Sequence, residues 1–164
     1  MGANKDFDLL YFVALRFLAH KPRTEYEVLQ KLLSYQKNHN LNTDESVNSA
    51  VIELLKREKY INDREYVNQY ISYQAQAGKK SLLVLQKFLL KKGVDKSQIK
   101  TTLAEYKGND LNTAKTLASK KLRSFKGKDI SPEKLRQKLL AFLLGKGLPF
   151  DDSSDAVDSL LGVK

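Results

Sequence analysis

Leucine-rich segments recur in this chain at intervals near 55 residues, and this spacing is the strongest constraint on its fold. Residues 84–89 read VLQKFL and echo residues 28–33, VLQKLL, 56 positions earlier. Residues 89–93 and 143–147 share the ending LLxKG. A repeat of this length predicts stacked supersecondary units rather than one intertwined bundle. We expect an all-α chain of three tandem three-helix repeats, at residues 1–59, 60–107 and 108–164.

Local start signals place the helices within each repeat. Thr24 and Glu27 have capping-box spacing at the start of the second predicted helix. Thr43 or Asp44 is expected to cap the third helix and Asn62 or Asp63 the fourth. Ser131 followed by proline predicts the start of the eighth helix. The first helix is expected at residues 6–20, the second up to residue 36 and the ninth at residues 152–161.

The segment 78–93 has glycine at both ends and predicts the central helix of the middle repeat. At about 100° per residue, its leucines at 82, 85 and 89 share one side. Its lysines at 80, 87 and 91 gather on the opposite side. The leucine side is required by the core, whereas the lysine side is the better candidate for function.

Charge is distributed unevenly along the chain. Residues 1–77 hold 10 basic and 10 acidic side chains, whereas residues 78–149 hold 18 basic and five acidic ones. The last 15 residues are acidic, and the net charge of the whole chain is +10. A polarised basic region favours an anionic partner, either nucleic acid or an acidic protein surface. A solvated lysine-rich surface without a partner is the competing interpretation.

No active site can be assembled from the sequence. There is no cysteine, and the two histidines, His20 and His39, have no metal-ligand spacing around them. No Walker motif and no nucleophile–base pair is present. We therefore expect no enzyme activity, cofactor or metal. No apolar run approaches the ~18 residues that span a bilayer, which predicts a cytoplasmic protein.

The motifs, in their order and spacing, resemble the RecX family. Residues 22–28 (PRTEYEV) look like its first-repeat signature, and residues 60–66 (YINDREY) are similar to its link into the second repeat. Residues 78–94 resemble the second-repeat motif and residues 137–147 the third, so that the resemblance covers about residues 8–161. Three departures are a long Asn-rich connection at 34–44, Leu148 where an aromatic often follows the glycine, and the acidic run at 151–155.

The resemblance implies an elongated, curved array that modulates the bacterial RecA recombinase in DNA repair and recombination. Members of the family bind in the groove of the RecA–DNA filament, and many inhibit its ATPase and strand exchange. Some also bind DNA, and none is established as an enzyme. We expect a monomer that binds the RecA filament, with single- or double-stranded DNA as a further candidate partner. The alternative is a free-standing helical protein that binds DNA or RNA without sequence preference.

The candidate partner-binding residues form one set, called here the basic set. Most are lysines, which act as point charges suited to phosphates or carboxylates rather than to reading bases. A tyrosine series at 66, 70 and 73 is interpreted as a half-buried core stripe. The basic set comprises Arg23, Lys79, Lys80, Lys87, Lys91, Lys92, Lys115, Lys120, Lys121, Arg123, Lys126, Lys128, Lys134, Arg136 and Lys138.

Overall fold

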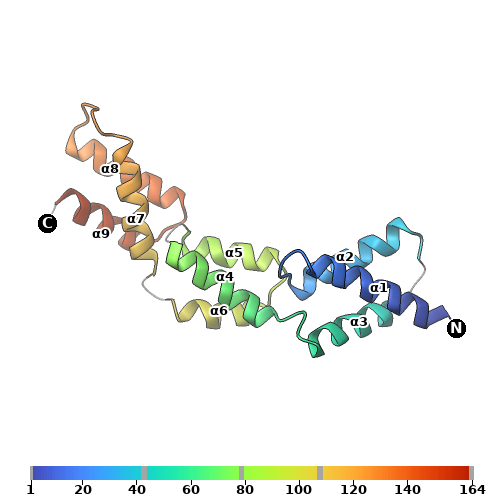
Figure 1. The fold of residues 1–164 in the computed structure, drawn as a ribbon. Helices are drawn as coiled ribbons and strands as arrows, with labels where there is room; N and C mark the ends of the chain where they lie inside the picture. Colours follow the sequence, from blue (N-terminus) through green and yellow to red (C-terminus); the bar gives the residue numbers. More distant parts are fainter. Residues whose placement is uncertain (1, 42–43, 78–79, 107–108, 163–164) are drawn as a thin grey trace. The chain divides into compact units, whose positions relative to one another are not determined.

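The structure, a computed structural model, describes residues 2–41, 44–77, 80–106 and 109–162. Within these ranges all regular structure is α-helical, which confirms the predicted fold class (Figure 1). The helices are α1 (Gly2–Leu18), α2 (Glu25–Asn38), α3 (Glu45–Arg57), α4 (Asp63–Ala77), α5 (Leu82–Lys91), α6 (Lys96–Ala104), α7 (Asn109–Arg123), α8 (Pro132–Gly145) and α9 (Phe150–Leu161). The curvature of the array stays a prediction.

The predicted start signals act as helix caps. Thr24 and Glu27 form both bonds of a capping box. Asp44 caps α3, while the alternative at position 43 lies outside the described residues. Asn62 accepts a backbone hydrogen bond in the first turn of α4 at 3.0 Å, and Ser131 caps α8. Each cap satisfies an amide that has no partner inside its own helix.

The chain divides into two compact units, and each has a buried core. The first unit comprises Met1–Asn68 and Leu90–Lys96, and the second comprises Gln69–Leu89 and Ser97–Lys164. Helices α1, α2 and α3 pack together in the first unit, and α7, α8 and α9 pack together in the second. The division passes through the predicted second repeat, so the boundaries 60–107 stay a prediction. The core of the first unit contains Leu10, Ala14, Val28, Leu32, Val51, Leu55 and Ile61, and that of the second contains Ala114, Ala118, Leu139, Leu143, Leu148, Ala156 and Val157.

In the first unit, the start of α2 is bonded to residues far along the chain. The Thr24 hydroxyl donates to the carbonyl oxygen of Lys92 at 2.7 Å. The amide of Glu25 donates to Asp63 Oδ1 at 2.8 Å. Gly93 follows with a φ of +76°, where a Cβ atom would stand 2.3 Å from the Cβ of Tyr26. The start of α2 is therefore fixed by Asp63 and Lys92 as well as by its own cap.

In the second unit, the start of α5 has the same arrangement. The Ser81 hydroxyl donates to the carbonyl oxygen of Lys146 at 3.2 Å. The amide of Leu82 donates to Asp110 Oδ1 at 2.8 Å, and Gly147 follows with a φ of +78°. The two sets of bonds, called here the helix-start junctions, repeat a buried hydroxyl, an aspartate and a glycine with positive φ.

The junctions give a repeat register that differs by one residue from the sequence echo. The echo aligns residue 28 with residue 84, but Val84 is 36% exposed while Val28 is fully buried. Leu85 and Leu89 are fully buried, as are Val28 and Leu32. The equivalent positions are therefore 57 residues apart, which also aligns Thr24 with Ser81. The buried positions are set by where each helix starts. The segments of similar sequence are therefore offset by one residue from the structurally equivalent positions.

Asp63 provides a pH-dependent test of the first junction. Burial raises the pKa of its carboxyl above the ordinary 3.8, although the bond from the Glu25 amide opposes this. Because the folded state holds this proton more tightly than the unfolded state, the contribution of Asp63 to stability falls as pH rises through that raised pKa. We expect the stability of the wild type relative to Asp63→Asn to decrease from pH 3.8 to neutrality, measured by urea unfolding.

Glu27 is the matched control, because its shift has the opposite sign. Burial alone would raise its pKa, but hydrogen bonds from Lys92 and from the Thr24 amide lower it below the ordinary 4.5. Relative to Glu27→Gln, the wild type should therefore gain stability as pH rises toward that value. Parallel pH profiles for the two comparisons would contradict the assignment of Asp63 to a buried junction.

Candidate partner-binding surface

Helix α5 has the two-sided character predicted for it. Leu85 and Leu89 are fully buried, and Lys87 and Lys91 are exposed. Within the described residues neither lysine forms an ion pair. Lys87 and Lys91 are four residues apart and so lie on the same face of the helix. This face is available to an anionic partner.

Lys80 does not lie on that exposed row, which corrects the predicted group of three. It precedes α5, and its ammonium donates to the Tyr70 hydroxyl at 3.0 Å. The same ammonium lies 5.5 Å from the ring centroids of Tyr70 and Phe88, which stack at 4.5 Å. Lys80 therefore supports the contact between α4 and α5. Lys79 lies outside the described residues.

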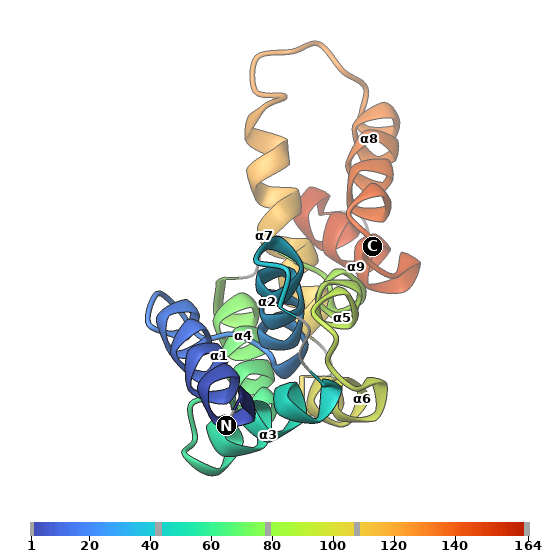
Figure 2. The same ribbon diagram turned by 90° about the vertical axis from the view of Figure 1, so that its right-hand side faces the viewer.

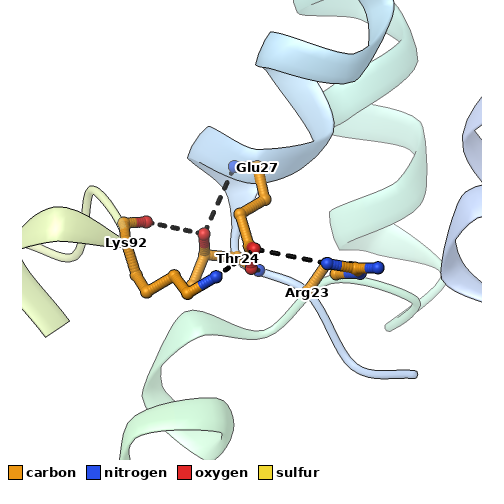
Figure 3. Close-up of polar contacts among 4 residues, drawn as sticks. All are labelled: Arg23, Thr24, Glu27 and Lys92. Carbon is orange, nitrogen blue, oxygen red and sulfur yellow. Dashed lines mark hydrogen bonds and ion pairs between the residues drawn. The ribbon is translucent and has the colours of Figure 1, made fainter. Parts of the chain in front are cut away.

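Arg23 and Lys92 converge on one carboxylate in the first unit. Figure 3 shows both side chains directed at Glu27, beside the Thr24 cap. Lys92 Nζ lies 2.5 Å from Glu27 Oε1 and Arg23 Nη1 lies 3.4 Å from it. The guanidinium of Arg23 also stands 4.2 Å above the ring centroid of Phe17. These two members of the basic set therefore stabilise the start of α2.

Arg136 is also engaged within the fold. Its guanidinium makes two bonds to Asp158, at 2.6 and 2.8 Å, and a third to the Ser154 hydroxyl at 3.0 Å. The hydrogen bond from Arg136 lowers the pKa of the Asp158 carboxyl below its usual value. A two-point contact of this kind fixes orientation as well as charge. Arg136 therefore joins α8 to α9.

The remaining cations lie on α7, on α8 and on the connection between them. All but Lys121 are exposed, and within the described residues none takes part in an ion pair. Ala114 and Ala118 face the core from α7, so the charged positions of this helix are directed elsewhere. Apart from Lys121, these cations, together with Lys87 and Lys91, are the part of the basic set that a partner can reach. The cations of this region are Lys115, Lys120, Lys121, Arg123, Lys126, Lys128, Lys134 and Lys138.

Three of these lysines gather around one aromatic ring. Lys121, Lys128 and Lys138 place their ammonium groups 5.2, 5.6 and 6.0 Å from the ring centroid of Phe125. These distances are within the range of cation–π attraction. The nearby lysines were visible in the sequence, but their convergence on the ring depends on how α7 and α8 pack.

The tyrosine series of α4 matches the expected core stripe in part. Tyr66 and Tyr70 are half-buried, whereas Tyr73 is 67% exposed. The Tyr70 ring stacks on Phe88. Only Tyr73 is thus placed differently from the prediction.

The aspartates of the helix-start junctions were missed as a pair. Asp63 was predicted as a possible cap for its own helix, and no bond to a second helix was predicted for Asp63 or Asp110. A sequence pattern could have indicated both junctions. It consists of a small hydroxyl residue just before a helix and an aspartate at the start of the helix two places further along the chain. That combination occurs with Thr24 and Asp63, and again with Ser81 and Asp110.

Two properties of the described residues bear on the class of protein. Among the residues whose placement is described, no group of three or more histidine, cysteine or acidic side chains is arranged to hold a metal ion. None of the described helices is long and apolar enough to cross a membrane. The described residues instead carry cations without an ion pair on α5, α7, α8 and the connection between α7 and α8.

The fold defines an all-helical protein of the repeat-array class, and cations without an ion pair among the described residues lie on α5, α7 and α8. Residues 109–157 match the family model described as "RecX, third three-helix domain". The chain is 34% identical over 148 residues to the "Regulatory protein RecX" of two Streptococcus pneumoniae strains, Hungary19A-6 and CGSP14. That match covers 90% of this chain and 54% of each relative, so the chain spans about half the length of these curated relatives.

Solved structures agree with this likeness. A crystal structure of RecX from Lactobacillus salivarius is similar with a TM-score of 0.81 and 27% identity, covering 98% of this chain and 99% of that one. A crystal structure of another regulatory protein RecX shares the fold, with a TM-score of 0.74 and 21% identity over 99% of this chain and 74% of the other. The resemblance to the RecX family indicated by the sequence motifs is thereby confirmed.

Proposed function

We propose that this protein regulates the RecA recombinase by binding the RecA–DNA filament. The observation that carries the proposal is its likeness to proteins named regulatory protein RecX over 90% of its length. The free cations of α5, α7 and α8 supply a surface for acidic protein groups or exposed phosphates. The proposed outcome is inhibition of the filament's ATPase and strand exchange.

The proposed mechanism is physical rather than catalytic. The protein lies in the groove of the filament and bridges successive RecA protomers, so that access of duplex DNA and nucleotide turnover are both reduced. Lysine ammonium groups suit this role because they attract phosphates and carboxylates without demanding one geometry. Binding is therefore independent of DNA sequence and weakens as salt rises.

Titration into a RecA filament tests the proposal. With RecA assembled on single-stranded DNA, we expect added protein to lower the steady-state ATPase rate in a saturable manner. The matched measurement is affinity for the same DNA with and without RecA. Preferential binding to coated DNA supports the filament as the target. An unchanged ATPase rate together with no binding to coated DNA would exclude it.

The comparison of coated with bare DNA also distinguishes RecA regulation from a second candidate function. In that candidate, the protein binds nucleic acid by itself, without RecA. The specific observation in its favour is the group of free cations in 115–138, which matches the electrostatic requirements of a phosphate backbone. Equal or tighter binding to bare DNA or RNA, with a steep salt dependence, would favour this candidate over RecA regulation.

A further inference from the structure

A pocket of about 470 Å³ opens in the second unit between α7, α8 and α9. Four apolar residues line it, together with two cationic residues and Ser119. Its size is within the range of ligand-binding pockets. Figure 2 shows α7 and α8 extending past α9 toward the loop that joins them. The apolar lining residues are Leu122, Phe125, Leu135 and Leu160.

The rim of this pocket is strongly cationic. Arg123 and Lys126 belong to its wall and are exposed. Neither takes part in an ion pair with any described residue. Lys128 and Lys138 stand within 6.0 Å of the Phe125 ring, which lines the same pocket, and the described lining contains no acidic side chain. A ligand that fits this pocket therefore carries both negative charge, for the rim, and apolar groups, for the lining.

The chemistry of the lining favours a peptide over a nucleic acid. Base recognition needs open aromatic faces or hydrogen-bonding groups. Here the Phe125 ring is already approached by three ammonium groups, and the leucines offer no hydrogen bonds. Leucine side chains do accept aliphatic and aromatic side chains of a partner, and the rim cations suit flanking carboxylates.

We propose that this pocket docks a short acidic protein segment that carries bulky apolar side chains. The apolar side chains enter between Leu122, Leu135 and Leu160, and the flanking carboxylates bind Arg123 and Lys126. The inference goes beyond the proposed function, because it does not require the partner to be RecA. An assay without RecA or DNA tests it separately.

The probe is a synthetic, fluorescently labelled peptide with two leucines and one phenylalanine set among glutamates. Fluorescence anisotropy with the full chain should show saturable binding. The double variant Arg123→Glu/Lys126→Glu should weaken that binding by about tenfold. The matched control, Lys115→Glu/Lys120→Glu, changes the same amount of charge on α7 but outside the lining, and should lower affinity less than about twofold.

Two further measurements separate pocket docking from charge attraction. Replacing the leucines and phenylalanine of the peptide by serine should abolish binding, since the apolar anchor is then lost. Ser119→Trp should fill the pocket and block binding without altering charge, and circular dichroism confirms that the helices persist. Equal binding of the serine peptide, or no effect of Ser119→Trp, would overturn the proposal. So would displacement of the peptide by a single-stranded oligonucleotide that binds at Arg123 and Lys126.

Discussion

Gly93→Ala is expected to destabilise the first unit by about 3 kcal/mol or more. The φ of +76° alone costs an L-residue ~1–2 kcal/mol, and overpacking adds ~1–3 kcal/mol. The clash cannot be relieved by rotating a ring, because the added methyl would stand 2.3 Å from the Cβ atom of Tyr26. The start of α2 has to move instead, which weakens the bonds of Thr24 and Glu25. Urea unfolding followed by circular dichroism measures the loss.

Gly127→Ala is the matched control for this substitution. Gly127 has a nearly identical φ of +78°, but no atom lies within 4 Å of the position of an added Cβ. We expect it to lose only about 1 kcal/mol, because the conformational strain is partly offset by a less flexible unfolded chain. In a Tyr26→Gly background, which removes the clashing atom, Gly93→Ala should cost about as much as Gly127→Ala. Equal losses for the two alanine variants in the native background would contradict the close contact.

The double variant Lys87→Glu/Lys91→Glu is expected to weaken binding to RecA-coated DNA by about tenfold or more. Exposed ion pairs contribute ~0.2–1 kcal/mol each, and charge reversal both removes two attractions and introduces two repulsions. Leu85 and Leu89 occupy the other side of α5 and remain buried, so the fold should persist. Binding is measured by anisotropy of the labelled protein at several salt concentrations.

Lys31→Glu/Lys37→Glu is the control for that measurement. Both lysines are exposed on α2, and Lys37 lies in the last turn of its helix, as Lys91 does in α5. The two double variants therefore suffer a similar unfavourable interaction with a helix dipole. A loss of affinity shared equally by both would indicate net charge alone and count against a defined binding face on α5.

Much of the local structure was predictable because its causes are local. The starts of α2 and α8 follow from Thr24 and Ser131, whose hydroxyls accept bonds from amides three residues away. The leucine side of α5 follows from helical periodicity. The uneven charge along the chain is likewise a property of the sequence, and it indicated where a binding surface was to be sought.

Whether each cation forms an ion pair within the fold was not predictable, because the pairing depends on residues distant in sequence. Lys92 meets Glu27 across 65 positions, and Arg136 meets Asp158 across 22. Nothing in the residues around Lys92 distinguishes it from Lys91, which has no ion pair among the described residues. The pocket beside Phe125 likewise requires three helices to pack before it exists.

The sequence by itself determined which segments are helical and where the caps of α2 and α8 lie, because both depend on neighbours within one or two helical turns. Only the tertiary structure decided the true register of the repeat and the two helix-start junctions. The Thr24 hydroxyl bonds to a carbonyl 68 positions away, and the Glu25 amide bonds to a carboxylate 38 positions away. Only folding of the chain brings such groups together. Folding therefore also decides which cations pair within the protein and which remain without an ion pair.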